Sequence, residues 1–268
     1  MCAGVDLNVE PVWDDGWNGA GVQIAIVDEG VNPRHPDIEG NYKAQHSWDF
    51  NFNKPDASSY AWVSHGTTMA SLAAGAHNTI CSVGVAFEAG ISSIRIASKP
   101  TTDTQEANAL RFDSINNDIY VNAWGPPDDA VRLEGPGPLA AEALKSGAQR
   151  GRAGLGSIFV WAAGNGREVG DNCNYDGYVN SRYTIAVGSH GFYGGPSSYS
   201  EPCASLIITA PSSGEGRRLL MGATGTSQCE QMFSGSSGSA YVIGERTRSL
   251  TCSLANSLES IVVPWLVV

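Results

Sequence analysis

A run of β-prone residues near the start of the chain ends in an acidic side chain. Residues 22–27 read VQIAIV, and Asp28 follows them directly. Near-continuous apolar runs of this length are typical of strands in parallel sheets, because helices cover both faces of such sheets. Sites in open α/β sheets lie at the carboxyl ends of the strands, so the pattern predicts that Asp28 stands at the functional edge of a parallel sheet. Taken alone, such an aspartate is more often a turn residue or a helix cap.

Two later segments complete a set of groups suited to nucleophilic catalysis. His65 opens the small-residue stretch 65–75 (HGTTMASLAAG), and Ser237 lies in 235–240 (GSSGSA). Small residues let a helix pack tightly against a sheet, which would bring the imidazole close to the hydroxyl. A serine becomes nucleophilic when an imidazole accepts its proton and a buried carboxylate holds that imidazole in one tautomer. The order Asp28, His65, Ser237 is that of the subtilisin arrangement and differs from the chymotrypsin and α/β-hydrolase orders.

Asn165 is a fourth candidate. It lies in 161–166 (WAAGNG), directly after the strand pattern of 156–160 (GSIFV). Its amide is suited to stabilise the oxyanion of a tetrahedral intermediate, an interaction worth roughly 3–4 kcal/mol in subtilisin. The alternative is an ordinary turn asparagine before glycine. We interpret the remaining histidines as surface or capping residues: His35, His46, His77 and His190.

Strand-like and helix-like segments alternate along the chain, as a doubly wound parallel α/β sheet requires. A proline followed by strong helix formers supports the helix that begins near residue 138. The expected strands are 22–28, 91–96, 118–123, 156–162, 183–188 and 205–209. The expected helices are 65–76, 104–112, 137–150 and a last one from 237 onward.

Composition agrees with a single enzyme-sized core. The chain has 268 residues, of which 42% are hydrophobic, enough for one large domain. Its 27 acidic and 16 basic residues give a net charge of −11, which argues against a nucleic-acid partner. The acidic side chains could bind cationic peptides or calcium, or could merely keep the surface solvated. No stretch reaches the roughly 18 apolar residues that a membrane helix needs, so no membrane span is expected.

Four further segments carry a family resemblance: 122–129 (NAWGPPDD), 154–161 (GLGSIFVW), 171–178 (DNCNYDGY) and 199–203 (YSEPC). With the triad segments, they make the chain from about Asp6 to Ala240 resemble the catalytic domain of the kexin/furin family of proprotein convertases, within the subtilisin-like serine proteases. The resemblance implies a subtilisin-like doubly wound parallel sheet flanked by helices on both faces. It also implies cleavage of precursor proteins after basic residues, at pairs or at Arg-x-x-Arg-type sites.

The same resemblance implies an acidic substrate cleft. Asp128 and Asp176 match the primary specificity pocket, which binds the residue before the scissile bond. Glu29 matches the next pocket, and Glu106 with Glu134 the pocket two residues further out. Each acid taken singly is usually a solvated surface residue. Ala123, Trp124 and Gly125 would pair as an edge strand with the extended substrate.

One departure bears on specificity. Residues 61–63 (AWV) replace the acidic stretch that the family has just before the catalytic histidine. We therefore expect a weakened preference for the second basic residue.

Calcium is the cofactor that the resemblance implies, and its ligands are the oxygen donors that a hard cation prefers. One site lies under the primary pocket, where the three carboxylates could instead serve arginine recognition alone. Its matched ligands are Asp128, Asp171 and Glu201. A second site matches Asp6, Asp49, Asn78 and the backbone oxygens of Ile80 and Ser82.

Six cysteines allow fifteen pairings, so their spacing alone settles nothing. The resemblance matches Cys173 with Cys203 and Cys81 with Cys229, which implies an oxidising compartment of the secretory pathway, Golgi, endosomal or extracellular. Reduced thiols in a cytosolic protein are the alternative. Cys2 and Cys252 have no counterpart in the family.

The resemblance stops at Ala240. Family members continue with a proline and a long apolar helix, whereas Tyr241 takes the place of the proline and 241–248 (YVIGERTR) brings charges where burial is costly. We expect a peptidase domain over 1–240 and an atypical, mis-spliced or frame-shifted tail over 241–268, with the fold incomplete at its C-terminus. Residues 1–6 lack the features of a signal peptide. The family's inhibitory propeptide and downstream β domain are also absent from this sequence, so a fragment is expected.

Two functions follow from these observations. In the first, the chain is a calcium-dependent serine endopeptidase in which Asp28 orients His65, His65 is the base, Ser237 the nucleophile and Asn165 the oxyanion donor. In the second, the chain is an inactive fragment or pseudoprotease that binds basic peptides in its acidic cleft. Intact triad residues favour the first function, and the unusual tail favours the second.

Overall fold

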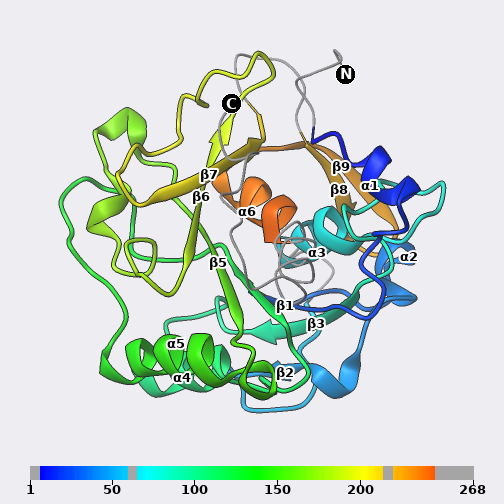
Figure 1. Cartoon of the computed structure of the whole chain (residues 1–268), viewed down its shortest axis with the longest axis horizontal. Coiled ribbons are helices and arrows are strands. Elements are labelled where there is room, and N and C mark those ends of the chain that lie inside the picture. The colour runs from blue at the N-terminus through cyan, green and yellow to red at the C-terminus, as the bar shows by residue number, and fades with distance from the viewer. Residues whose placement is uncertain (1–6, 60–64, 214–219, 245–268) are drawn as a thin grey trace, which may run out of the picture.

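A seven-stranded parallel sheet forms the centre of the chain in its computed structural model (Figure 1). The structure describes residues 7–59, 65–213 and 220–244, the side chains of 230–233 and 244 excepted. The strand order is β2-β3-β1-β4-β5-β6-β7, so the chain crosses over β1 between β3 and β4. Such a crossing is a topological switch point, where α/β sheets form their sites. The strands are β1 (Gln23–Asp28), β2 (Trp48–Asp49), β3 (Gly90–Arg95), β4 (Ile119–Asn122), β5 (Ile158–Ala162), β6 (Ile185–His190) and β7 (Leu206–Pro211).

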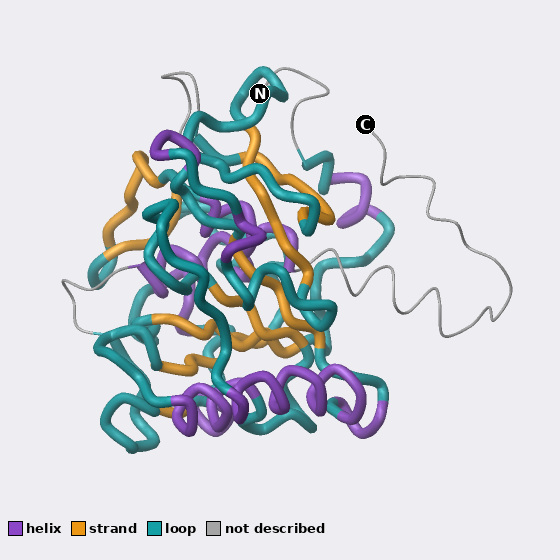
Figure 2. The backbone as a smooth tube through the Cα atoms, turned by 90° about the vertical axis from the view of Figure 1, so that its left-hand side faces the viewer, coloured by secondary structure: helices purple, strands orange, loops and turns teal. Residues whose placement is uncertain are grey.

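Helices cover both faces of the sheet. Alternate residues of β1 face opposite layers: Ile24 and Ile26 join one apolar cluster, and Ala25 and Val27 the other. The first cluster contains α3 (His65–Ala74) and α6 (Ser236–Gly244), and the second contains α4 (Asp103–Leu110) and α5 (Pro138–Arg150). Figure 2 shows α4 and α5 as a layer below the strands. Burial on both sides explains why β1 has an almost continuous apolar sequence.

The six strands and four helices expected from the sequence are all present, and the predicted doubly wound α/β class is confirmed. Local signals explain the helix starts. Thr102 and Gln105 form a reciprocal capping box at α4, and Pro138 begins α5. Short elements were not expected: the strand β2, the helices α1 (Glu10–Asp14) and α2 (Pro36–Glu39), the hairpin β8 (Leu220–Thr224) and β9 (Gln228–Phe233), and the 3₁₀ turns η1 (Ala44–His46), η2 (Arg152–Gly154), η3 (Arg167–Val169) and η4 (Cys173–Tyr175).

Two disulfides join distant segments, and both are those that the family resemblance implied. Cys81–Cys229 has a Cα–Cα distance of 5.4 Å, and Cys173–Cys203 one of 5.3 Å. The first bond ties the loop after α3 to β9, just before α6. The second ties η4 to the loop before β7. Cys2 and Cys252 lie outside the described residues.

The last described helix passes the domain boundary that the sequence suggested. α6 runs without interruption from Ser236 to Gly244, across the expected junction between 240 and 241. Tyr241 is fully buried, and Val242 and Ile243 are 4% exposed. The first residues of the expected tail therefore belong to the apolar core, and residues 245–268 lie outside the described part of the chain. Within the described ranges, none of the helices combines the length and apolarity needed to cross a membrane.

Candidate active site

The sheet and α3 bring Asp28 and His65 into direct contact. Asp28 is the last residue of β1, and His65 is the first residue of α3. The Nδ1 atom of His65 lies 2.9 Å from both carboxylate oxygens of Asp28, which is 2% exposed. An acceptor at this place holds the neutral imidazole with its proton on Nδ1, so Nε2 is left as the basic nitrogen.

Glycine makes this contact possible. A Cβ atom on Gly66 would lie 2.3 Å from the backbone oxygen of Gly30 and 3.3 Å from the Cβ of Asp28. Real Cβ atoms do not approach a backbone oxygen that closely, so a larger residue would push the start of α3 away from β1. The small residues of 65–75 thus act as the sequence predicted, by allowing close packing.

Further hydrogen bonds fix the Asp28 carboxylate. The backbone N–H of Glu29 donates to Oδ1 at 2.7 Å, and the hydroxyl of Tyr241 lies 3.2 Å from Oδ2. Sequence reasoning missed Tyr241 as a site residue and interpreted it as a departure from the family. The signal that was available is its spacing: Tyr241 follows Ser237 by four residues on the same helix, which places both on one side of α6.

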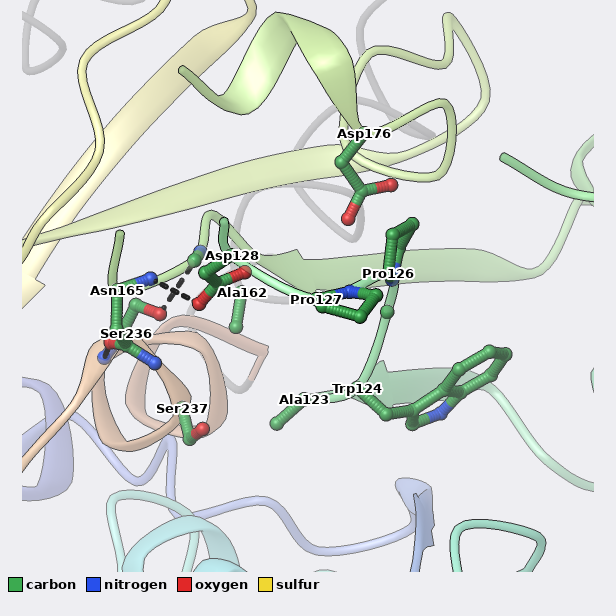
Figure 3. A pocket seen from close by; sticks show the side chains of 12 residues that line it. Ala123, Trp124, Pro126, Pro127, Asp128, Ala162, Asn165, Asp176, Ser236 and Ser237 are labelled. Carbon is green, nitrogen blue, oxygen red and sulfur yellow. Dashed lines mark hydrogen bonds between the residues drawn. The ribbon is translucent and has the colours of Figure 1, made fainter. Parts of the chain in front are cut away.

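Ser237 lies in the first turn of α6 and lines a cavity of about 210 Å³ (Figure 3). Tyr241 lies one turn later on the same side of α6, and its hydroxyl contacts Asp28. Ser237 is 9% exposed. The other residues that line the cavity are Ala123, Trp124, Gly125, Pro126, Pro127, Asp128, Ala162, Gly164, Asn165, Asp176 and Ser236.

Asn165 is held at the rim of this cavity by two hydrogen bonds (Figure 3). Its backbone N–H donates to Oδ2 of Asp128 at 2.7 Å, and its Oδ1 accepts from the backbone N–H of Ser236 at 2.9 Å. Because Oδ1 is engaged by the start of α6, the amide Nδ2 is the group left to donate to an oxygen in the cavity. The geometry suits the donor role expected from the sequence.

Two carboxylates, those of Asp128 and Asp176, also line the cavity. Oδ1 of Asp176 accepts from the backbone N–H groups of Tyr178 at 2.7 Å and Val179 at 3.3 Å. Its Oδ2 is so close to Gly125 that an added Cβ there would lie 2.7 Å away. Burial raises the pKa of Asp176 to about 6 and also raises the pKa of Asp128. Desolvated carboxylates of this kind favour a cationic partner.

The other three predicted substrate acids lie outside the lining of this cavity. Glu106, on α4, accepts from the hydroxyl of Thr101 at 2.8 Å and from that of Tyr178 at 2.6 Å. The backbone of Glu134 forms a parallel bridge with that of Asp176, so Glu134 lies beside the segment that carries Asp176. Glu29 follows Asp28 directly, and burial, then the neighbouring Asp28 charge, raises its pKa.

Three acidic side chains meet behind the cavity wall. Each of Asp128, Asp171 and Glu201 has an oxygen within 4.8 Å of the others. Glu201 is 3% exposed, and burial together with the charges of Asp128, Asp171 and Asp176 raises its pKa to about 7. Carboxylates crowded in this way disfavour their own charges unless a cation joins them, and an all-oxygen set is the kind that Ca²⁺ prefers. The residues therefore fit the cation that the resemblance implies.

The residues of the second expected calcium set make contacts of other kinds. Asp49 lies on β2, where its carboxylate accepts from the backbone N–H of Phe52 at 2.9 Å and pairs with Arg95 at 3.4 Å. Asp37, on α2, is the acid that reaches the loop of Asn78, Ile80 and Ser82: its Oδ2 accepts from the N–H of Ser82 at 3.4 Å. Asn78 turns its Oδ1 toward the N–H of Ile80 at 2.7 Å. Asp6 lies outside the described residues.

An unsatisfied atom makes Asp37 a further candidate ligand beside this loop. Oδ1 of Asp37 is buried and has no hydrogen-bond partner among the described residues. A buried carboxylate oxygen without a partner is costly, so Asp37 suits a cation better than Asp49, whose charge Arg95 already balances. Sequence reasoning missed Asp37 because the stretch from His35 to Asp37 is also a normal helix start, with a cap and a proline in the first turn.

Solved structures with a similar fold are subtilisin-like. A cold-adapted subtilisin-like serine proteinase matches with a TM-score of 0.67 and 21% identity, over 90% of this chain and 79% of that one. The serine protease of Aeromonas sobria, solved with its chaperone, matches with a TM-score of 0.77 and 16% identity, over 90% of this chain and 49% of that one. At these identities the likeness concerns the fold alone.

Sequence comparison identifies nearer relatives. A PC3-like endoprotease variant B of Hydra vulgaris is 44% identical over 89% of this chain and 35% of its own length. Human furin is 42% identical over 88% of this chain and 30% of its own length, and a dibasic-processing endoprotease of Yarrowia lipolytica is 43% identical over 79% and 22%. The chain thus spans about a third or less of the length of these relatives. The sequence model of the Subtilase family matches residues 19–245. With its Asp28–His65 pair at the switch point of the sheet, the chain belongs to the subtilase family.

Proposed function

We propose that this chain is a serine endopeptidase of the proprotein-convertase type, which cleaves precursor proteins after arginine or lysine. One observation carries the proposal: a single cavity is lined both by Ser237 and Asn165 and by two carboxylates, those of Asp176 and Asp128. The first pair suits acyl transfer, and the second suits a cationic side chain next to the scissile bond. The relatives described as furin and as a dibasic-processing endoprotease support the same substrate class.

In the proposed mechanism, the hydroxyl of Ser237 attacks the substrate carbonyl while Nε2 of His65 accepts its proton. Asp28 stabilises the imidazolium through Nδ1 and keeps its own charge. The oxyanion that forms accepts a hydrogen bond from Nδ2 of Asn165. His65 then gives the proton to the leaving amine, and a water molecule releases the acyl group by the same route in reverse.

Substrate orientation follows from the wall of the cavity. Residues 123–125 continue β4 past its end and would pair with the extended substrate backbone. The guanidinium of an arginine before the scissile bond enters between Asp176 and Asp128. Glu106 and Glu134 attract a second arginine three positions earlier, and Glu29 an optional basic residue between the two. The weaker preference that we expect for this middle residue depends on Trp62, which lies outside the described ranges.

Calcium belongs to this proposal as a structural ion. Asp128, Asp171 and Glu201 would hold it under the specificity pocket, where it balances their charges and fixes the loop that carries Asp128. The two disulfides support an oxidising compartment, so we place the protein in the secretory pathway. An inhibitory propeptide and a downstream β domain are further partners that the family resemblance implies.

Labelling by a fluorophosphonate probe tests the catalytic part of the proposal. We expect the wild-type chain to be labelled and Ser237→Ala to be unlabelled. Ser239→Ala is the matched control, because the hydroxyl of Ser239 lies on the same helix but donates to the backbone oxygen of Ala210 at 2.9 Å. An unlabelled wild-type chain that still binds arginine peptides would support the binding-only function instead.

A peptide series tests the specificity. The wild-type chain should cleave peptides with arginine before the scissile bond far faster than the same peptides with leucine there. Equal rates for the two would show that the acids of this cavity do not select the substrate.

A further inference from the structure

The hydroxyl of Tyr241 reaches the acid of the candidate triad from inside the core. Tyr241 is among the largest fully buried side chains of the described residues. Its hydroxyl oxygen lies 3.2 Å from Oδ2 of Asp28 and 3.0 Å from the backbone oxygen of Val121. A tyrosine hydroxyl has one proton to donate, so the two acceptors share or compete for it.

The hydrogen bonds of Asp28 show what this hydroxyl contributes. His65 Nδ1 is equally close to both carboxylate oxygens, at 2.9 Å, and the N–H of Glu29 serves Oδ1 alone. The Tyr241 hydroxyl is the further donor for Oδ2. Because Asp28 is 2% exposed, water cannot readily replace a lost donor, and a buried carboxylate with fewer donors is costly. Burial, then the Asp28 charge, raises the pKa of Tyr241 well above its ordinary value, so the hydroxyl stays a donor.

Tyr241 also connects the two halves of the candidate site mechanically. It stands one helical turn after Ser237 on α6, while Asp28 ends β1 and Val121 lies on the neighbouring strand β4. A contact from the nucleophile helix to the orienting acid therefore fixes how far α6 stands from the ends of β1 and β4.

We propose that Tyr241 is a positioning residue, whose hydroxyl holds the Asp28 carboxylate in place for His65 and sets the distance between that pair and Ser237. The proposal rests on the function proposed above for the same site. It would also give a role to Tyr241, the residue at which the sequence analysis expected an atypical tail to begin. The alternative is a purely structural role, in which the Tyr241 hydroxyl donates to the backbone oxygen of Val121 alone. The experiments below distinguish the two roles.

NMR titration of His65 is the first test, because it reports on the pair whether or not the chain turns over substrate. The expected result is a rise of about half a pH unit or more in the pKa of His65 in Tyr241→Phe, since a carboxylate that loses a donor concentrates its charge on the imidazolium. Glu29 and Arg95 are the other charged groups that act on this cluster, and both are unchanged in the variant.

Tyr120→Phe is the matched control. Tyr120 is also fully buried and lies on β4, but it belongs to the opposite face of the sheet and its hydroxyl donates to the backbone oxygen of Phe112 at 2.6 Å. The control should leave the titration of His65 unchanged. An identical titration in wild type, Tyr241→Phe and Tyr120→Phe would overturn the proposal.

Replacement of Tyr241 by 3-fluorotyrosine provides a second variant in case Tyr241→Phe does not fold. Fluorine makes the hydroxyl a stronger donor with little change of shape, so the pKa of His65 should move down instead of up. A fluorotyrosine chain with an unchanged His65 titration would argue against the proposal just as directly.

Kinetics form the last readout. Tyr241→Phe should lower kcat by about ten-fold with KM changed less than two-fold, because the hydrogen bond that is lost is to the orienting carboxylate of Asp28 and not to a group of the substrate cleft. Tyr120→Phe should keep the wild-type kcat. An inactive wild-type chain would refute the proposed function while the titration still decides the role of Tyr241, and a Tyr241→Phe chain with normal kcat and normal titration would refute the positioning role alone.

Discussion

At the scale of single residues, the acids of the cleft differ in how far their oxygens are already occupied. Each carboxylate oxygen of Glu106 accepts a hydrogen bond, one from the hydroxyl of Thr101 and the other from that of Tyr178. Asp176 uses Oδ1 for two backbone N–H groups and turns Oδ2 toward Gly125 and the cavity. A guanidinium that enters the cavity therefore gains more from Asp176, whose charge is poorly solvated.

Asp176→Asn should consequently weaken arginine-directed cleavage more than Glu106→Gln. We expect kcat/KM for a peptide with arginine before the scissile bond to fall by an amount equivalent to about 2–5 kcal/mol in the first variant, because it leaves the substrate charge buried without its partner. The loss in the second should stay near 1 kcal/mol, as for exposed charge pairs. Steady-state kinetics with matched peptides measures both, and equal losses would contradict the assignment of Asp176 to the primary pocket.

The sequence suggested that Asp28 and His65 lie together, as they do in the structure, but it did not suggest that Asp37 lies beside Ser82. Strand ends are fixed by strong apolar patterns, so the contact of Asp28 with His65 follows once the sheet forms. The position of Asp37 depends on where the four-residue helix α2 lies, and no periodic pattern specifies so short an element. Tyr241 was missed for a related reason, since its partner is 213 positions away in the sequence.

At the scale of elements, the start of α3 packs tightly against the end of β1. The sequence predicted this helix and the close packing of its small residues, because the stretch from His65 to Gly75 is continuous and distinctive. It could not predict β8, β9 or β2, whose positions depend on contacts with other parts of the fold. Thr68 on α3, for example, donates to the backbone oxygen of Ala223 on β8 at 2.8 Å.

Gly66→Ala should disturb this packing. The added methyl would lie 2.3 Å from the Gly30 oxygen, so α3 must shift and carry His65 away from Asp28. We expect a loss of about 1–3 kcal/mol in the free energy of unfolding, as for other overpacked cores, together with slower fluorophosphonate labelling. Gly40→Ala is the control, because a Cβ at Gly40 meets no atom within 4 Å. Denaturant unfolding of both variants measures the difference, and equal stabilities would show that α3 has room to spare.

At the scale of the whole molecule, three acidic side chains from separate loops lie close together. The three acids are Asp128, Asp171 and Glu201, which lie in the loops before α5, η4 and β7 respectively. A cation held there would join these loops, and its removal would leave their charges to repel one another.

Calcium should therefore raise the stability of the whole fold. At a calcium concentration about 100-fold above the dissociation constant, binding to the folded state alone adds about 2.7 kcal/mol to the free energy of unfolding. Thermal unfolding with calcium and with chelator should show this shift in the wild-type chain and a much smaller one in Glu201→Gln. Glu142→Gln is the control, since Glu142 is exposed on α5 and pairs with Lys145 at 3.6 Å. A full calcium response in Glu201→Gln would remove Glu201 from the ligand set.

The late position of α6 has a consequence for the order in which the molecule can form. β1 is synthesised well before α6, the helix that covers one of its faces. Tyr241 on α6 contacts Asp28 on β1 across a sequence separation of 213 residues. Contacts over such separations close slowly, because the intervening chain must first be ordered. We expect pulsed hydrogen exchange during refolding to protect the amides of α4 and α5 before those of α3 and α6. One face of β1 thus stays without its covering helix until more than 200 further residues have been synthesised.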